Sequence, residues 1–192
     1  IADHTLKMLR GAMAECRMGN PGRLTTDIGP VIDSEAKANI ERHIQTMRSK
    51  GRPVFQAVRE NSEDAREWQS GTFVAPTLIE LDDFAELQKE VFGPVLHVVR
   101  YNRNQLPELI EQINASGYGL TLGVHTRIDE TIAQVTGSAH VGNLYVNRNM
   151  VGAVVGVQPF GGEGLSGTGP KAGGPLYLYR LLANRPERAL AV

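Results

Sequence analysis

The residues best suited to hold a ligand lie in a glycine-rich run between Met150 and Pro175. This run contains nine glycines and three prolines, so it cannot form a regular helix or a central strand. Glycine lets the main chain approach a ligand or another backbone closely, because it has no Cβ. A solvated linker would be polar and rich in serine, whereas this run carries the apolar side chains Val154, Val155, Val157 and Phe160. The composition therefore predicts an ordered loop that lines a pocket.

Part of this run, Gly162 to Gly167, matches the G-x-G-x-x-G spacing of a dinucleotide-binding fingerprint. That fingerprint binds a pyrophosphate only where its glycines open a helix, whose N-terminus then faces the phosphates. Further glycines and prolines follow here up to Pro175, and they exclude a helix. We therefore do not interpret the match as a nucleotide site.

Other reactive side chains give weaker signals. Cys16 is the single cysteine, and its helical spacing with the apolar residues before it predicts a place on the buried face of a helix, where a thiol is inert. The five histidines are scattered without the spacing of metal ligands, so no metal site is expected. The carboxylates of Asp82 and Asp83 are expected to be solvated.

Glu90 has a more suggestive position, in the segment Lys89-Glu90-Val91-Phe92-Gly93-Pro94 just before a predicted strand. Open α/β sheets place ligand-binding loops at strand ends, and a carboxylate there can accept hydrogen bonds from both hydroxyls of a ribose. A surface glutamate without such a role is the commoner case, so Glu90 alone does not predict a cofactor site.

The bulk composition narrows the class of protein. With 192 residues, 41% of them hydrophobic, the chain can bury a core. A formal net charge of −1 and the absence of basic runs argue against nucleic acid as a partner, and no apolar run is long enough to span a membrane. A single cysteine excludes an internal disulfide and favours a cytoplasmic location. The chain opens on Ile1 inside a helical pattern, which we interpret as a piece of a longer protein.

The residues named above must be positioned by the secondary structure. The sequence predicts two helices, followed by strands that alternate with helices. Helices are predicted to about Arg17 and from the N-cap Asp33 to Lys50, and later at 106–114 and 128–135. Apolar or β-branched runs predict strands at 54–58, 72–81, 95–101, 120–126 and 143–147. Strands that alternate with helices predict an α/β fold with a largely parallel open sheet and helices on both faces.

Three motifs in order resemble the C-terminal half of the aldehyde dehydrogenase superfamily, over about residues 3 to 182. They are Glu90-Val91-Phe92-Gly93-Pro94, then Gly142-Asn143-Leu144-Tyr145-Val146-Asn147, then Pro159-Phe160-Gly161-Gly162 with Ser166-Gly167-x-Gly169. The ending Pro170-Lys171-Ala172-Gly173-Gly174-Pro175 resembles the L-glutamate-γ-semialdehyde (pyrroline-5-carboxylate) dehydrogenases, in particular the dehydrogenase module of bifunctional bacterial enzymes of proline utilisation. Most relatives of the superfamily carry Gly-x-Glu-x-Gly instead.

The resemblance implies an NAD-dependent enzyme and a role for several residues. Glu90 would bind the nicotinamide ribose, and Phe92 would pack near the nicotinamide. Gly152 and Ala153 would donate backbone N–H groups to the substrate carboxylate, and Phe160 would wall the aldehyde tunnel. Peptide N–H groups in a glycine turn suit a carboxylate, and an aromatic ring suits an aliphatic stem.

The resemblance also implies what lies elsewhere. The family's nucleophilic cysteine and glutamate base lie upstream of the first helix, so no catalytic residue is expected in this chain and it should be inactive alone. FAD would be used only by a proline dehydrogenase domain of the parent chain, if there is one. Residues 1–175 would be the C-terminal portion of the catalytic domain, and 176–192 a strand or tail used in homo-oligomerisation or an ordinary core strand. A dehydrogenase for another aldehyde and a non-catalytic assembly or binding module remain alternatives.

Overall fold

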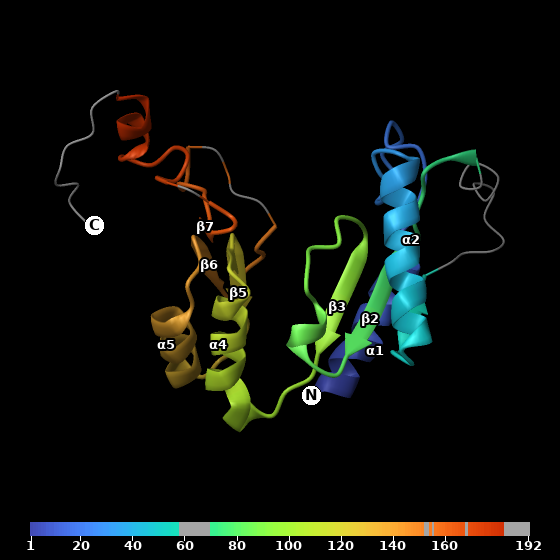
Figure 1. Cartoon of the computed structure of the whole chain (residues 1–192), viewed down its shortest axis with the longest axis horizontal. Coiled ribbons are helices and arrows are strands. Elements are labelled where there is room, and N and C mark those ends of the chain that lie inside the picture. Colours follow the sequence, from blue (N-terminus) through green and yellow to red (C-terminus); the bar gives the residue numbers. More distant parts are fainter. Residues whose placement is uncertain (58–69, 152–153, 155, 168, 183–192) are drawn as a thin grey trace. The chain divides into compact units, whose positions relative to one another are not determined.

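The structure, a computed structural model, describes residues 1–57, 70–151, 154, 156–167 and 169–182 (Figure 1). The chain divides into two compact units, Ile1–Arg100 and Tyr101–Val192. The boundary near residue 175 that the sequence predicts is therefore not the boundary between these two units. Among the described residues, no helix combines the length and the apolar character that a membrane span requires.

Helix α2 (Ser34–Ser49) organises the first unit, and its ends follow the predicted capping. The Asp33 side chain accepts a hydrogen bond of 2.7 Å from the backbone N–H of Ala36, as an N-cap does. Gly51 follows the C-cap Lys50 with a φ of 75°, a conformation that glycine adopts without strain. The second predicted helix is confirmed.

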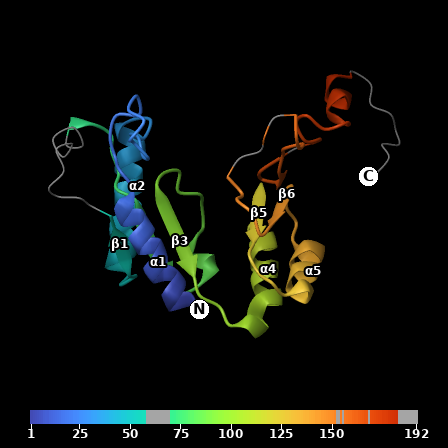
Figure 2. The same cartoon turned by 180° about the vertical axis from the view of Figure 1, so that it is seen from behind.

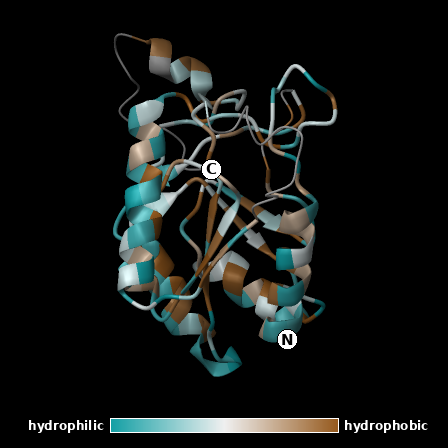
Figure 3. Cartoon of the chain, turned by 90° about the vertical axis from the view of Figure 1, so that its right-hand side faces the viewer, coloured by the Kyte–Doolittle hydropathy of each residue, from teal (hydrophilic) through white to brown (hydrophobic). Residues whose placement is uncertain are grey.

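A three-stranded sheet completes this unit, with the order β1-β2-β3. Its strands are β1 (Val54–Gln56), β2 (Thr77–Leu81) and β3 (Val95–Val99), and β2 pairs antiparallel with β1 and parallel with β3. The buried side chains of α2 pack against this sheet in one apolar cluster, formed by Ile40, Ile44, Met47, Val74, Ile79 and Leu81. Figure 3 shows the hydrophobic colour running along the strands, as expected where the sheet carries the core.

Helix α1 (Ala2–Glu15) lies on the other face of this sheet (Figure 2). Ile79 and Leu81 face α2, and side chains alternate along a strand, so Glu80 points away from α2. The Glu80 carboxylate accepts a 2.6 Å hydrogen bond from Arg10 of α1, and it also binds Arg100 at 3.0 Å. Arg100 also pairs with Asp3 of α1 at 2.6 Å, so Arg10 and Asp3 both attach α1 to the sheet.

The position of Cys16 differs from the prediction. Helix α1 ends at Glu15, and Cys16 is its C-cap with an extended backbone, so the thiol is half-buried rather than on the buried face of a helix. The chain leaves the helix here because an isolated bridge joins Met18 to Ile28 and pulls the backbone into an extended course. Leu6 is the one buried side chain of α1.

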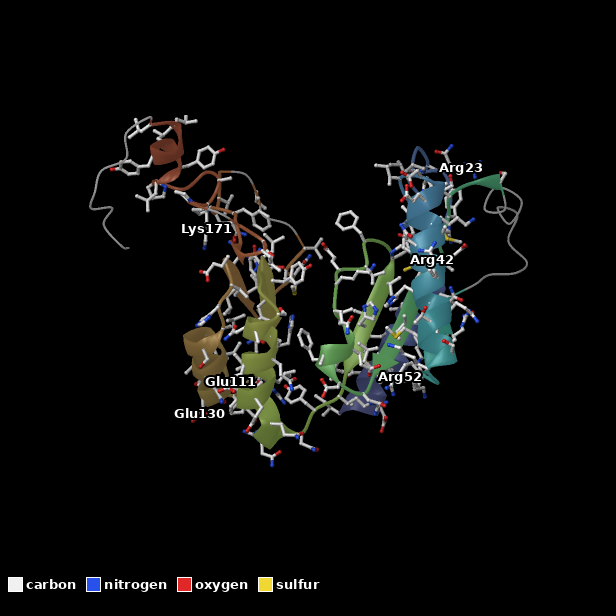
Figure 4. All side chains as sticks on the ribbon, viewed as in Figure 1. Arg23, Arg42, Arg52, Glu111, Glu130 and Lys171 are labelled. Carbon is white, nitrogen blue, oxygen red and sulfur yellow. The ribbon has the colours of Figure 1, made fainter. Side chains whose placement is uncertain are left out.

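The carboxylates of Asp82 and Asp83 are exposed, as expected, but each has a structural role. Asp83 caps the 3₁₀ helix η1 (Phe84–Glu86) by accepting a 2.7 Å hydrogen bond from Ala85 N–H. Asp82 pairs with Arg52, which also binds Glu86 at 2.9 Å (Figure 4). Arg52 thus holds η1, and the segment that contains Glu90 begins shortly after it.

The second unit alternates helices and short strands. It contains η2 (Arg103–Gln105), α4 (Leu106–Ala115), β4 (Tyr118–Gly119), β5 (Thr121–Val124), α5 (Asp129–Ser138), β6 (Asn143–Val146), β7 (Glu163–Gly164) and η3 (Tyr177–Leu181). Strands β5 and β6 pair in parallel through α5, a βαβ unit, while β4 and β7 pair antiparallel. The predicted helices at 106–114 and 128–135 and the predicted strands at 120–126 and 143–147 are confirmed within a few residues.

Two predictions on the fold need correction or refinement. The fold is α/β, but the described strands form three small sheets with both parallel and antiparallel pairs rather than one largely parallel sheet. Residues 177–181 form a 3₁₀ helix instead of a strand. The turn at Gly173 and Gly174 starts local hydrogen bonds such as Tyr177 N–H to Gly174 O, and no described strand lies beside this segment to take its backbone groups.

Candidate functional site

The segment from Lys89 to Pro94 is held by its alternate residues. Val91 packs against the apolar cluster of the first unit, whereas Glu90 is exposed and Phe92 is 85% exposed. Gly93 lies so close to α2 that a Cβ there would overlap the Cδ1 atom of Ile40. The Pro94 carbonyl accepts a 2.9 Å hydrogen bond from Thr77 N–H, at the start of the β2–β3 ladder. The motif therefore presents Glu90 and Phe92 outward from a fixed backbone.

Glu90 and Phe92 present a carboxylate and an aromatic ring to solvent. Among the described residues, no side chain binds the Glu90 carboxylate, so both of its oxygens are open to hydroxyl donors. The exposed ring of Phe92 offers an apolar face two residues away.

Sequence reasoning missed a pair of histidines in the same unit. His43 of α2 and His97 of β3 bring their Nε2 atoms within 2.8 Å, with the rings edge to face. Burial, with the neighbouring His43, lowers the pKa of His97 from its ordinary 6.5 to about 4. Burial also lowers the pKa of His43, and the nearby Lys89 and Lys50 act in the same direction. Both imidazoles are therefore neutral near pH 7. The Nε2–H group of one ring donates a hydrogen bond to the Nε2 atom of the other.

We expect this pair to make the stability of the chain depend on pH between about 6.5 and 4. Unfolded His97 takes up a proton near its ordinary pKa of 6.5, whereas folded His97 does so only near 4. The free energy of unfolding should therefore be highest above pH 6.5 and fall as the pH is lowered through this window. Urea midpoints measured at several pH values should decline less steeply in His97→Gln. The exposed His125 supplies a control, since His125→Gln should keep the original decline. Equal slopes in all three proteins would contradict the expectation.

The motif from Gly142 to Asn147 forms strand β6 and its two ends. At the carboxyl end, the Asn147 side chain accepts a 2.9 Å hydrogen bond from Thr126 N–H and donates one of 2.8 Å to Thr126 O. Asn147 has a φ of 53°, which asparagine tolerates better than most residues. In the middle of the strand, the buried Tyr145 accepts a 2.7 Å hydrogen bond from the amide of Gln158. The strand thus binds the backbone after β5 through Asn147, and Gln158 through Tyr145.

Phe160 lies in a backbone bridge within the glycine-rich run. Its N–H donates to Ala172 O at 3.0 Å, and its carbonyl accepts from Ala172 N–H at 2.9 Å. The residue is half-buried. Its neighbour Gly161 approaches β6 so closely that a Cβ on Gly142 would overlap the Gly161 carbonyl oxygen, while Lys171 donates to the Gly142 carbonyl (Figure 4).

The glycines of the false fingerprint serve close backbone contacts. No helix opens among the described residues here, because Glu163–Gly164 is strand β7 and a turn follows. A Cβ on Gly162 would lie 2.5 Å from the Ser166 carbonyl oxygen, and one on Gly167 would overlap the carbonyl oxygen of Gly162. The described part of this stretch is therefore an ordered loop without the helix that a dinucleotide fingerprint requires, and its predicted place beside a pocket stays a prediction.

The remaining predicted residues, Gly152 and Ala153, lie outside the described residues. Their described surroundings include Val151, whose N–H donates to the Asn149 side chain at 2.6 Å, and Gly156, with a φ of 80°. Glu90 and Phe92 belong to the first unit and Phe160 to the second. In the described part of the chain, no group of three or more histidine, cysteine or acidic side chains could hold a metal ion.

The chain is similar in sequence and in fold to several known proteins. The bifunctional protein PutA of Salmonella typhimurium is 93% identical to this chain over 190 residues, which make up 99% of this chain and 14% of that protein. A solved structure of a mutant of proline utilization A (PutA) from Bradyrhizobium japonicum has a TM-score of 0.83 and 49% identity, covering 92% of this chain and 17% of that one. A 1-pyrroline-5-carboxylate dehydrogenase from Thermus, solved with bound NAD, has a TM-score of 0.71 and 37% identity, covering 85% of this chain and 30% of that one.

The chain thus spans between 14% and 30% of the length of these three proteins. The family model described as "Aldehyde dehydrogenase family" matches residues 1–183, which include the Glu90 segment, strand β6 and the glycine-rich run. The chain belongs to the aldehyde dehydrogenase family.

Proposed function

We propose that this chain is the C-terminal portion of the catalytic domain of an NAD-dependent dehydrogenase that oxidises L-glutamate γ-semialdehyde to L-glutamate in proline catabolism. The names of the relatives support the substrate, because both PutA and 1-pyrroline-5-carboxylate dehydrogenases are among them. The structural observation that carries the proposal is the fixed loop that presents the Glu90 carboxylate and the Phe92 ring outward, two residues apart in sequence and without a described partner.

Each site residue has a distinct part in this proposal. Glu90 accepts hydrogen bonds from the hydroxyls of the nicotinamide ribose, and Phe92 packs beside the nicotinamide. Gly152 and Ala153 donate backbone N–H groups to the α-carboxylate of the substrate. Phe160 contacts the aliphatic stem between that carboxylate and the aldehyde. NAD, when bound, supplies the hydride acceptor, and these residues hold the two reactants in place.

The residues that react with the aldehyde are proposed to lie outside this chain. In the family a cysteine thiolate attacks the aldehyde carbon and a glutamate acts as base. We give neither role to a residue of this chain. In the complete protein, the strands described here would be part of a largely parallel open sheet with helices on both faces. Residues 1–175 would belong to the catalytic domain, and the protein would be cytoplasmic, in agreement with its single cysteine.

The C-terminal tail favours a second, structural role for part of the chain. Leu178 is 71% exposed and Leu181 is 75% exposed in η3, an unusual concentration of apolar side chains at a surface. We propose that residues 176–192 contribute to a homo-oligomer of the full-length protein. Sedimentation of a protein truncated after Pro175 tests this role, and an unchanged oligomer would contradict it.

Steady-state kinetics of the full-length protein tests the enzymatic proposal. With NAD as the second substrate, we expect kcat/KM for L-glutamate γ-semialdehyde to exceed that for propanal by at least about tenfold, because propanal has no carboxylate for the backbone N–H anchor to hold its short chain against Phe160. The 192-residue chain by itself should show no turnover of either aldehyde. Equal kcat/KM values for the two aldehydes would contradict the proposed substrate.

A further inference from the structure

Three asparagines of the second unit use their side-chain amides in the same way. Each donates from its nitrogen to a backbone carbonyl and accepts with its oxygen from a backbone N–H on a separate segment. Asn114 binds Ser138 O and His140 N–H, both at 2.8 Å. Asn147 binds both groups of Thr126. One amide thus joins two stretches of backbone, as a pair of strands would, without a continuous ladder.

Asn143, the third of them, binds the backbone on both sides of Phe160. Its Nδ2 donates to the Pro159 carbonyl at 2.9 Å, and its Oδ1 accepts from Gly161 N–H at 3.2 Å. The orientation of the amide is defined, because a carbonyl can only accept and a backbone N–H can only donate. Asn143 lies at the first position of β6, four residues before Asn147.

The two bonds of Asn143 complete the fixation of the Phe160 backbone. Both backbone groups of Phe160 are already paired with Ala172. With Asn143 in place, every hydrogen-bonding backbone group from the Pro159 carbonyl to the Gly161 N–H has a partner. The backbone dihedral angles set the direction of the Cα–Cβ bond and restrict the rotamers, so this arrangement limits where the Phe160 ring can point.

We infer that Asn143 is a positioning residue that sets the aldehyde selectivity of the enzyme by holding the Phe160 ring in place. This inference rests on the proposed function, in which Phe160 contacts the aliphatic stem of the substrate. Without the amide, the Pro159 carbonyl and the Gly161 N–H lose their partners, and the backbone on both sides of Phe160 gains freedom to move the ring. Displacements of about 1 Å at a substrate contact are enough to lower catalytic efficiency strongly.

The test compares Asn143→Ala with Asn114→Ala in the full-length enzyme. Asn114 is the matched control, since it makes the same two kinds of bond between α4 and the end of α5, away from the Phe160 segment. The measured quantity is the ratio of kcat/KM for L-glutamate γ-semialdehyde to that for propanal. We expect this ratio to fall about tenfold in Asn143→Ala, mainly through a higher KM for the semialdehyde, and to stay within about twofold in Asn114→Ala. The KM for NAD should not change in either variant.

A double mutant separates positioning from a general structural role. If Asn143 acts through the ring, Asn143→Ala should cause no further fall of the ratio in a protein that already carries Phe160→Ala. Asn143→Asp is a second variant of the same size that keeps the acceptor for Gly161, but it places a carboxylate oxygen against the Pro159 carbonyl in place of the donor. It should also lower the ratio.

Several results would overturn the inference. One is an unchanged ratio in an active Asn143 variant, and another is a fall of the ratio that adds fully to that of Phe160→Ala. Insolubility of both Asn143 variants beside a soluble Asn114→Ala would assign the amide to folding instead. These outcomes differ from failure of the proposed function, which would appear as a lack of semialdehyde turnover by the unsubstituted enzyme.

Discussion

Replacing Glu90 with alanine in the full-length enzyme should raise the KM for NAD by about ten- to a hundredfold, because hydrogen bonds to a charged acceptor contribute about 1.5–3 kcal/mol. The carboxylate is exposed on a loop whose backbone is fixed by Val91, Gly93 and Pro94, so its loss should not disturb the surrounding structure. Glu90→Gln should have a smaller effect, since the amide keeps one acceptor oxygen but not the charge.

The measurement for Glu90 is initial-rate kinetics with NAD varied at a saturating aldehyde concentration. Glu111→Ala is a suitable control, because Glu111 is an exposed glutamate on α4 (Figure 4) and has no role in the proposed site. The KM for the aldehyde should stay within about twofold in both variants if Glu90 contacts only the cofactor. An unchanged KM for NAD in Glu90→Ala would show that the ribose hydroxyls bind elsewhere.

Replacing Gly164 with alanine should destabilise the second unit by at least about 2 kcal/mol, since strained left-handed residues alone cost about 1–3 kcal/mol. Gly164 has a φ of 58°, and a Cβ there would overlap the carbonyl oxygen of Gly117. That carbonyl also accepts a 2.8 Å hydrogen bond from Leu165 N–H, so the backbone cannot withdraw without breaking it. The β4–β7 pair is therefore expected to open.

Urea denaturation of the 192-residue chain measures this effect, and hydrogen exchange at the Leu165 amide locates it. Gly137→Ala provides the opposite control. Gly137 lies in α5 with no atom near the place of its missing Cβ, so alanine should stabilise the chain by up to about 1 kcal/mol through its higher helix propensity. If Gly164→Ala leaves both the urea midpoint and the exchange rate unchanged, the close approach of Gly164 to Gly117 does not affect the stability of the chain.

Local patterns predicted the elements of this fold well. The cap at Asp33 and the apolar face of α2 are properties of a few neighbouring residues, and both are confirmed. Short apolar runs likewise predicted the positions of β3, β5 and β6 along the chain. Helix α1 ends at Glu15, slightly before the predicted end at about Arg17, next to the bridge between Met18 and Ile28, which depends on residues beyond the helix.

The sequence did not predict the contacts between residues that lie far apart along the chain. His43 and His97 are 54 residues apart, and neither has a neighbour in sequence that would mark the pair. The equal roles of Asn114, Asn143 and Asn147 were also invisible, although the spacing of the last two places them at opposite ends of one strand. The sequence does not show what a side-chain amide binds, because its partners lie on other segments of the chain.

The sequence by itself determined the family and most of the helices and strands, and it predicts the residues that we propose to bind NAD and an aldehyde. These depend on local propensity and on ordered motifs, which can be read along the chain. Only the tertiary structure decided what the glycine-rich run packs against and how Phe160 is held. The glycines at Gly142, Gly162 and Gly167 make room for carbonyl groups of the chain itself, and Asn143 fixes the backbone beside Phe160. Such contacts arise when folding brings separate segments together, so no single stretch of sequence contains them.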